Sequence, residues 1–172
     1  MSNTCVLTLP ANAMKALFLT ASHVAALLAG FALGIYTLPV LLEPEGPSQQ
    51  VLLESQADAL YRTSFRRDLP GSDFLHWGEG TLTLNSTHAV FKGEMSPGPD
   101  YFLYLSPSYV EDETGFLAVK AQALKVGPVK TFNGFILELP EGVSLDDYNT
   151  AVVWCERFGE FISAGQFRRK AL

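Results

Sequence analysis

The chain has 172 residues, of which 48% are hydrophobic and 17% charged, and its formal net charge is −6. This composition predicts one folded domain of ordinary size plus an extra segment, and it argues against disorder. It also argues against nucleic-acid binding, which needs a concentrated cationic surface. The basic cluster at Arg168, Arg169 and Lys170 fits a solvated tail, because three charges bind a lipid surface weakly.

The first predicted element is a membrane anchor over residues 16–42. This stretch contains no Asp, Glu, Lys or Arg, and roughly 20 helical residues suffice to cross hydrocarbon about 30 Å thick. Lys15 precedes the stretch and acidic residues follow it, so the positive-inside rule predicts a cytosolic tail over residues 1–15. The sequence therefore indicates a single-pass protein of the cell membrane. It would contact the lipid bilayer through residues 16–42, and its larger part would be periplasmic or extracellular.

A cleaved signal peptide is the alternative interpretation of this stretch. The apolar region of such a peptide spans about 7–15 residues and ends at a small-residue cleavage site. Here the stretch is longer and runs into LPVLLEPEGP without a clear site, so we expect an uncleaved anchor. Met14 would also be a natural start, which leaves open whether translation begins there or at Met1. Cys5 would be cytosolic and reduced, and it receives no role.

Residues 43–70 are expected to form a stalk next to the membrane. They begin with a polar stretch that contains prolines, EPEGPSQQ. The following segment, VLLESQADALYRTSFRRD, has apolar positions that suggest a short amphipathic helix. LPGSD at 69–73 contains turn-forming residues that mark the end of this helix.

Residues 71–170 are predicted to form an all-β domain. Short runs rich in β-branched and aromatic residues are separated by turn signals, and no helical pattern alternates with them. This pattern predicts an antiparallel β-sandwich or barrel of about seven or more short strands. Asn133-Gly134 is the best two-residue hairpin signal, since both positions tolerate positive φ. The expected strands cover 74–84, 88–95, 101–105, 116–126, 130–139, 150–155 and 160–167.

The exported part contains a single cysteine, Cys155, in the run AVVWCERFG. An odd cysteine in such a domain implies intermolecular pairing, a reactive thiol or a buried inert one. Strand alternation places Val153 and Cys155 on one face and Trp154 on the other, which predicts a central strand covered on both faces. Burial would raise the pKa of the thiol. A sharp turn at 157–159 would instead leave the thiol partly exposed beside Arg157, which would favour thiolate.

Haem ligation is one chemistry open to Cys155, because cysteine, histidine and methionine are the usual protein ligands of haem iron. His76, His88 and Met95 could supply a second ligand, and we take Cys155 and His76 as the candidate pair. The chain has no C-x-x-C-H attachment motif. Its histidines and cysteines lack the paired spacing of a structural zinc site, so no metal site is predicted. Nucleophile-elbow, P-loop and H-E-x-x-H motifs are also absent.

Four segments together resemble the DM-thirteen domain family, also called the electron-transfer or Skeletor-type DM domain. They are GEGTLTL, FKGEMSPGPDYFLYLSP, VKTFNGF and YNTAVVWCERFGEFISAGQF, and they follow the family's order between about Asp73 and Phe167. The resemblance implies an all-β domain outside the cell or in the periplasm, often behind an N-terminal anchor. It also implies a nearly invariant cysteine, matched here by Cys155, which takes part in electron transfer as a bare thiol or as a ligand to a group such as haem. Animal members add a haem-binding partner domain. This sequence contains none, so we expect a separate redox partner protein outside the cytosol.

Two functions of different classes are therefore open. The first is a membrane-anchored, extracytoplasmic redox protein whose Cys155 is accessible, with a lowered pKa or a histidine within ligand reach. The alternative is a non-catalytic β-sandwich binding module displayed on the membrane, with Cys155 in the core and an exposed aromatic patch of Tyr101, Phe102, Tyr104 and Tyr109. Enzymatic turnover by the isolated chain is the least supported, because one thiol without a resolving cysteine or a nearby base is a poor catalyst. A redox accessory protein is the role we expect.

Overall fold

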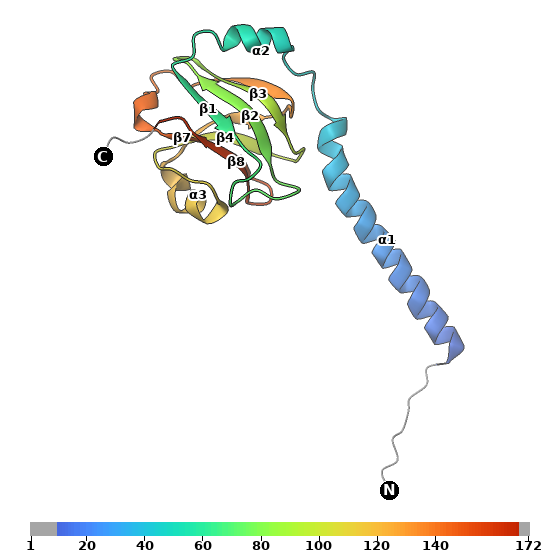
Figure 1. Ribbon diagram of the computed structural model, residues 1–172. Coiled ribbons are helices and arrows are strands. Elements are labelled where there is room, and N and C mark those ends of the chain that lie inside the picture. The colour runs from blue at the N-terminus through green and yellow to red at the C-terminus, as the bar shows by residue number, and fades with distance from the viewer. Residues whose placement is uncertain (1–9, 169–172) are drawn as a thin grey trace.

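The computed structural model describes residues 10–168 and places a long N-terminal helix beside a domain of two β-sheets (Figure 1). Helix α1 (Ala11–Leu41) covers the apolar stretch, and none of its residues is buried. By length and composition α1 could cross a membrane, as an anchor or as a signal sequence. Cys5 and the basic residues 169 and 170 lie outside the described residues.

Eight strands form two antiparallel sheets of four strands each, which confirms the predicted all-β class. The first sheet has the order β1-β2-β3-β6 and the second has the order β5-β4-β7-β8. The first comprises β1 (Tyr61–Phe65), β2 (Gly78–Leu84), β3 (His88–Met95) and β6 (Gly134–Glu138). The second comprises β4 (Tyr101–Ser106), β5 (Leu124–Val129), β7 (Thr150–Cys155) and β8 (Glu160–Gln166).

The two sheets enclose the main hydrophobic core, to which Phe91 and Phe135 contribute from the first sheet and Leu103 and Val153 from the second. The sheets also approach each other at both edges, where β1 lies next to β8 and β5 next to β6. The Thr63 hydroxyl on β1 donates a hydrogen bond to the carbonyl of Gln166 at the end of β8, at 2.9 Å. The architecture is therefore a sandwich that is closed at its edges like a barrel.

The outer face of the second sheet is covered by a short helix where the sequence predicts a strand over 116–126. Helix α3 (Glu113–Val119) and a single 3₁₀ turn, η1 (Lys120–Gln122), precede β5. The Asp112 side chain accepts a hydrogen bond from the Gly115 N–H and caps α3. Phe116 is fully buried against the rings of Tyr104 and Trp154. The predicted strand is therefore wrong over 116–122, where α3 and η1 form instead, and it is correct over 124–126, which belongs to β5.

The expected stalk helix is also shorter than predicted, because residues 61–65 belong to the first sheet. Helix α2 (Gln49–Ser55) covers one end of that sheet with the buried Leu52. The chain then forms β1, in which Thr63 and Phe65 are buried and Arg62 and Ser64 are exposed. This alternation of period two is what a half-buried edge strand requires.

The hairpin predicted at Asn133-Gly134 is wrong, because β5 and β6 belong to different sheets. Gly134 has a φ of +147°, and a Cβ there would lie 2.6 Å from Cδ1 of Leu52. The glycine therefore serves a crossover between the sheets and a close contact with α2.

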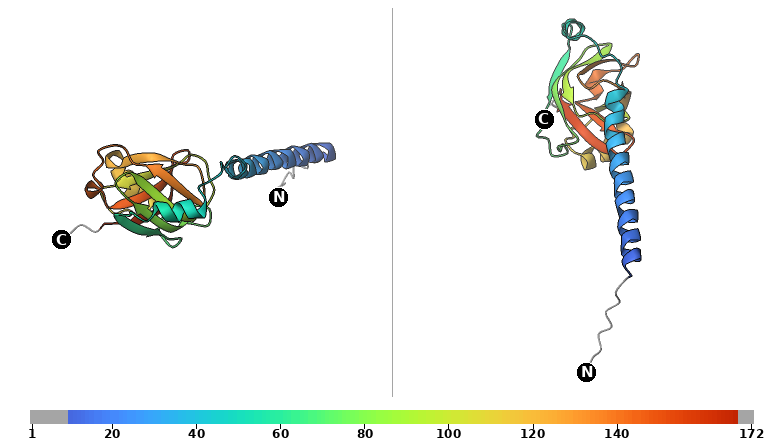
Figure 2. Two further views of the ribbon diagram at one scale, coloured as in Figure 1. Left: turned by 90° about the horizontal axis from the view of Figure 1, so that it is seen from above. Right: turned by 90° about the vertical axis from the view of Figure 1, so that its right-hand side faces the viewer.

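The connection between α1 and the β domain is short and is held by a hydrogen bond. Helix α1 ends at Leu41, and the Glu43 carboxylate already accepts the backbone N–H of Phe132 at 2.8 Å. The last turns of α1 consequently lie beside the β domain, and the rest of the helix projects away from it (Figures 1 and 2).

Candidate functional site

Cys155 is the last residue of β7, and the predicted strand environment around it is confirmed. Every residue of β7 is buried. Val153 and Cys155 face the core between the sheets, whereas Trp154 packs into the second cluster under α3. The chain turns immediately after Cys155, as expected, and the Gly159 N–H donates to the Cys155 carbonyl at 2.9 Å. Gly159 has a φ of +72°, which glycine adopts without strain.

The sulfur of Cys155 is covered by the loop that precedes β4. The thiol donates a hydrogen bond to the carbonyl of Pro99, with Sγ and O 3.1 Å apart. The Glu156 N–H donates to the Asp100 carbonyl at 3.0 Å, which fixes the loop over the end of β7. Asp100 has a φ of +63°, an unusual value for a non-glycine residue. The exposed fraction of Cys155 is only 2%.

Burial raises the pKa of the Cys155 thiol. The backbone N–H groups of Phe158 and Arg157 act in the opposite direction, and the carboxylates of Asp100 and Glu160 add to the increase. Arg157, whose cation the sequence suggests as a thiolate partner, lowers the pKa of the thiol here through its backbone N–H. Cys155 is therefore a protonated thiol in the folded protein near neutral pH, and it lacks the exposure and lowered pKa expected of a bare redox thiol.

A cavity of about 410 Å³ adjoins Cys155 and also contains His76. Its size falls within the range of about 300–1,000 Å³ typical of small-molecule sites. It is lined by Ala32, Ile35, Tyr36, Leu75, His76, Pro97, Gly98, Pro99, Tyr101, Cys155 and Phe158. We call it the Cys155 cavity. The two candidate haem ligands, His76 near the start of the β domain's sequence and Cys155 near its end, thus line the same cavity.

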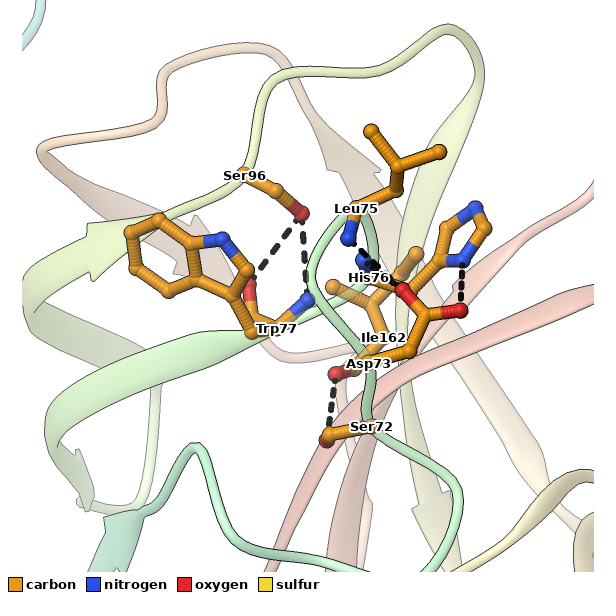
Figure 3. Close-up of polar contacts among 7 residues, drawn as sticks. All are labelled: Ser72, Asp73, Leu75, His76, Trp77, Ser96 and Ile162. Atoms are coloured by element: carbon orange, nitrogen blue, oxygen red, sulfur yellow. Dashed lines mark hydrogen bonds and ion pairs between the residues drawn. The ribbon is translucent and has the colours of Figure 1, made fainter.

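His76 is positioned by Asp73, which sequence reasoning did not single out. One carboxylate oxygen of Asp73 accepts the backbone N–H groups of Leu75 and His76, each at 2.7 Å. The other oxygen lies 3.1 Å from Nδ1 of His76 (Figure 3). Burial opposes ionisation of Asp73, but these hydrogen bonds, led by the one from His76, lower the pKa of its carboxyl below the ordinary value.

The loop that carries His76 is fixed at both ends. The Ser72 hydroxyl donates to the Ile162 carbonyl at 3.2 Å, which ties the loop to β8. The Trp77 N–H donates to the Ser96 hydroxyl at 3.1 Å, which ties it to the end of β3 (Figure 3). The predicted strand 74–84 therefore begins only at Gly78. Because Asp73 engages Nδ1, the Nε2 atom of His76 is the nitrogen left for a ligand.

The other candidate ligands lie elsewhere. His88 is the first residue of β3, and its Nδ1 lies 2.7 Å from the Thr87 hydroxyl oxygen. Met95 is buried in the core between the sheets, and neither residue lines the Cys155 cavity. Within residues 10–168, no group of three or more His, Cys, Asp and Glu side chains could hold a metal ion.

A charged cluster adjoins the site on the outer face of the second sheet. The Glu156 carboxylate accepts hydrogen bonds from Lys120, at 2.6 Å, and from the Tyr104 hydroxyl, and it lies 3.4 Å from Lys125. Burial opposes ionisation of Glu156. The hydrogen bonds from Lys120 and Tyr104, together with the two lysine charges, outweigh that effect and lower the pKa of the carboxyl to about 2. These contacts fix the side chain of Glu156, the residue that follows Cys155.

The aromatic patch expected for a binding module does not form. Tyr101 and Tyr104 are buried, and Phe102 is partly buried in the cluster under α3. Of the four expected residues only Tyr109 is strongly exposed, at 48%. The burial of Cys155 itself agrees with the binding-module hypothesis.

The residues around the cavity fit a haem-like group in two respects. Thiolate and imidazole are both axial ligands of haem iron. The Asp73–His76 contact is the carboxylate–histidine arrangement that commonly orients a metal-bound imidazole. The thiol would have to lose its proton on ligation, as metal binding requires.

Comparison with known proteins assigns the family. No curated protein and no solved structure matches the chain. A family model described as "Electron transfer DM13" matches residues 71–167, which is more than half of the chain and includes both Cys155 and His76. Strand β1 lies before the matched region and nevertheless completes the first sheet. The chain belongs to the electron transfer DM13 family.

Proposed function

We propose that the protein is a membrane-anchored, extracytoplasmic electron-transfer protein in which Cys155 and His76 hold a haem-like redox group. Membership of the electron transfer DM13 family supports a redox-related role. The observation that carries the proposal is that Cys155 and His76, 79 residues apart in the sequence, line one cavity. Helix α1 would anchor the domain, and a second protein outside the cytosol would supply or accept the electron.

The chemistry of the thiol favours ligation over oxidation of a bare thiol. Cys155 is buried, its pKa is raised, and residues 10–168 contain no second cysteine that could resolve an oxidised sulfur. A haem iron, when bound, would exchange a single electron between its ferric and ferrous states. The protein's own residues would supply an apolar cavity, a sulfur donor at the end of β7 and an imidazole whose orientation Asp73 fixes.

Titration of the full-length protein with hemin in detergent, followed by absorption spectroscopy, tests the proposal. We expect a Soret band in the wild type that is lost in Cys155→Ala and strongly altered in His76→Ala. His88→Ala is the matched control, because His88 does not line the cavity, and its spectrum should equal that of the wild type.

Two other outcomes would contradict ligation. If no band appears but Cys155 in the folded protein reacts readily with a thiol reagent, the redox group is the bare thiol. If no band appears and the thiol reacts only after denaturation, Cys155 is a core residue and the binding-module alternative replaces the redox function.

A further inference from the structure

The Cys155 cavity is built partly from helix α1. Ala32, Ile35 and Tyr36 form one wall, and the β domain forms the rest. A second cavity, of about 330 Å³, lies between Leu38, Pro39 and Leu42 and the loop before β4. Two adjacent cavities therefore share α1 as a wall. The position of α1 along the bilayer normal consequently determines how close this end of the β domain lies to the membrane surface.

The sequence of α1 indicates where the bilayer surface lies. Tyr36 follows Lys15 by 21 residues, which corresponds to about 32 Å of α-helix. That length matches a hydrocarbon core about 30 Å thick. Lysine and tyrosine are residues that mark the two interfaces of a membrane. With Lys15 at one interface, Tyr36 and the Cys155 cavity lie at the other.

The β domain presents exposed apolar side chains at this same end. Phe74 is 85% exposed, Leu75 is 40% exposed and Phe158 is 52% exposed. Leu75 and Phe158 line the Cys155 cavity, and Phe74 neighbours Leu75 on the loop fixed by Ser72 and Trp77. We call these three residues the apolar rim. They come from two separate loops, which argues against chance exposure along a single strand.

We propose that the apolar rim inserts into the leaflet on the β domain's side of the membrane, so that the Cys155 cavity opens at the bilayer interface. Lipid is the occupant that the geometry favours, because α1, which is long and apolar enough to cross a membrane, forms one wall of the cavity that Leu75 and Phe158 also line. Apolar side chains at this depth are transferred from water into an apolar environment, which stabilises the docked orientation. The inference rests on the membrane anchoring that forms part of the proposed function.

Tryptophan substitutions in the full-length protein test the docking without altering Cys155. Phe74→Trp and Phe158→Trp would be placed in phosphatidylcholine vesicles whose acyl chains carry bromine, a quencher of indole emission. Leu117→Trp is the matched control, because Leu117 is also 52% exposed but lies on α3, away from α1 (Figure 1). Emission is measured as the increment over the native Trp77 and Trp154.

We expect brominated lipid to quench most of the added emission of the two rim variants and none of that of Leu117→Trp. Acrylamide, a quencher in water, should show the reverse preference. Rim emission quenched by acrylamide and not by lipid would overturn the proposal. Rim emission protected from both would mean that a second copy of the chain covers the rim, and it would overturn the proposal as well.

Vesicle flotation separates this inference from the proposed function. A protein that fails to float with the vesicles lacks the anchor itself. A protein that floats with the vesicles, but whose rim tryptophans are quenched by acrylamide and not by lipid, is anchored without inserting the apolar rim. Haem titration is read independently of both results.

Discussion

The Nδ1 atom of His76 lies 3.1 Å from the carboxylate of Asp73, at the cavity that also reaches Cys155. This contact fixes the ring's orientation and makes Asp73 a positioning residue. We expect Asp73→Asn to weaken hemin binding by about 10- to 100-fold, the usual cost of losing such a partner. Asparagine can still accept the N–H groups of Leu75 and His76, so the loop should keep its shape.

The spectrum distinguishes positioning from a purely structural effect. Asp73→Asn should shift the Soret band and the reduction potential of the bound group while leaving the unfolding midpoint close to that of the wild type. Asp68→Asn is the control, because Asp68 is an exposed residue that pairs with Arg66 and does not line the Cys155 cavity. Unchanged affinity in Asp73→Asn would show that Asp73 does not position the ligand ring.

The raised pKa of Cys155 predicts slow alkylation of the folded protein at neutral pH. The rate of reaction with iodoacetamide, measured in a Cys5→Ser background, should rise with a midpoint above that of a free thiol, about 8.5. The same titration in denaturant should return to the ordinary midpoint. A midpoint at or below 8.5 in the folded protein would contradict the burial argument.

The same raised pKa has a stability consequence of defined sign. The folded state favours the protonated thiol, so the stability that this preference contributes is complete below about pH 8.5 and is lost as the pH rises through the folded pKa. Cys155→Ala should remove this alkaline component. Urea unfolding of both proteins between neutral and alkaline pH measures it.

The lowered pKa of Glu156 predicts that the folded protein loses stability at acidic pH. Its pKa is lowered to about 2 in the folded protein, and its unfolded value is about 4.3. The stabilisation is therefore present above about pH 4.3 and is lost as the pH falls towards 2. We expect Glu156→Gln to cost about 1–3 kcal/mol at pH 7 and to flatten the acid limb of the stability profile.

Urea unfolding between pH 2 and pH 7 measures this effect, with Glu138→Gln as the control at an exposed position of β6. If the free energy of unfolding falls equally with pH in the wild type and in Glu156→Gln, the pairs with Lys120 and Lys125 do not stabilise the folded protein.

The close approach of β2 and β3 predicts that Gly93 cannot be replaced by a larger residue without loss of stability. Gly93 pairs with Gly80 across the ladder, and a Cβ on Gly93 would lie 2.6 Å from the Cα of Gly80. Gly93→Ala should destabilise the domain by about 1–3 kcal/mol, since the backbones must separate. Gly127→Ala on β5 is the control, because its Cβ would meet only Leu137 at an ordinary 3.7 Å. Comparable unfolding midpoints for the two variants would refute the close-approach argument.

The sequence predicts those features that depend on local patterns. Buried residues on both sides of Cys155 and the turn that follows it could be read from the alternation in β7 and from Gly159. The all-β class follows from the spacing of the short runs. The errors, by contrast, occur where tertiary contacts decide the local conformation, as when Phe116 packs on Trp154 and forms α3 or when β1 joins the sheet from the expected stalk.

The candidate site could be predicted only in part. The sequence identifies Cys155, and His76 is one of several partners that it allows. No local pattern indicates that residues of α1 close a cavity that also contains Cys155, more than 100 positions further along the chain. The D-x-x-H spacing of Asp73 and His76 within a turn is the one signal that could have suggested the pair.

The short connection between α1 and the β domain, held by the contact of Glu43 with Phe132, would also affect how the proposed redox partner meets the protein. If α1 anchors the chain as proposed, a domain with so little slack could not swing out to capture a protein from bulk solution. Its encounters would be confined to the plane of the membrane, where local concentration is set by geometry and surface density. Electron transfer through this protein should therefore depend on lateral diffusion and on how many partners share its patch of membrane, and much less on the partner's total amount in the compartment.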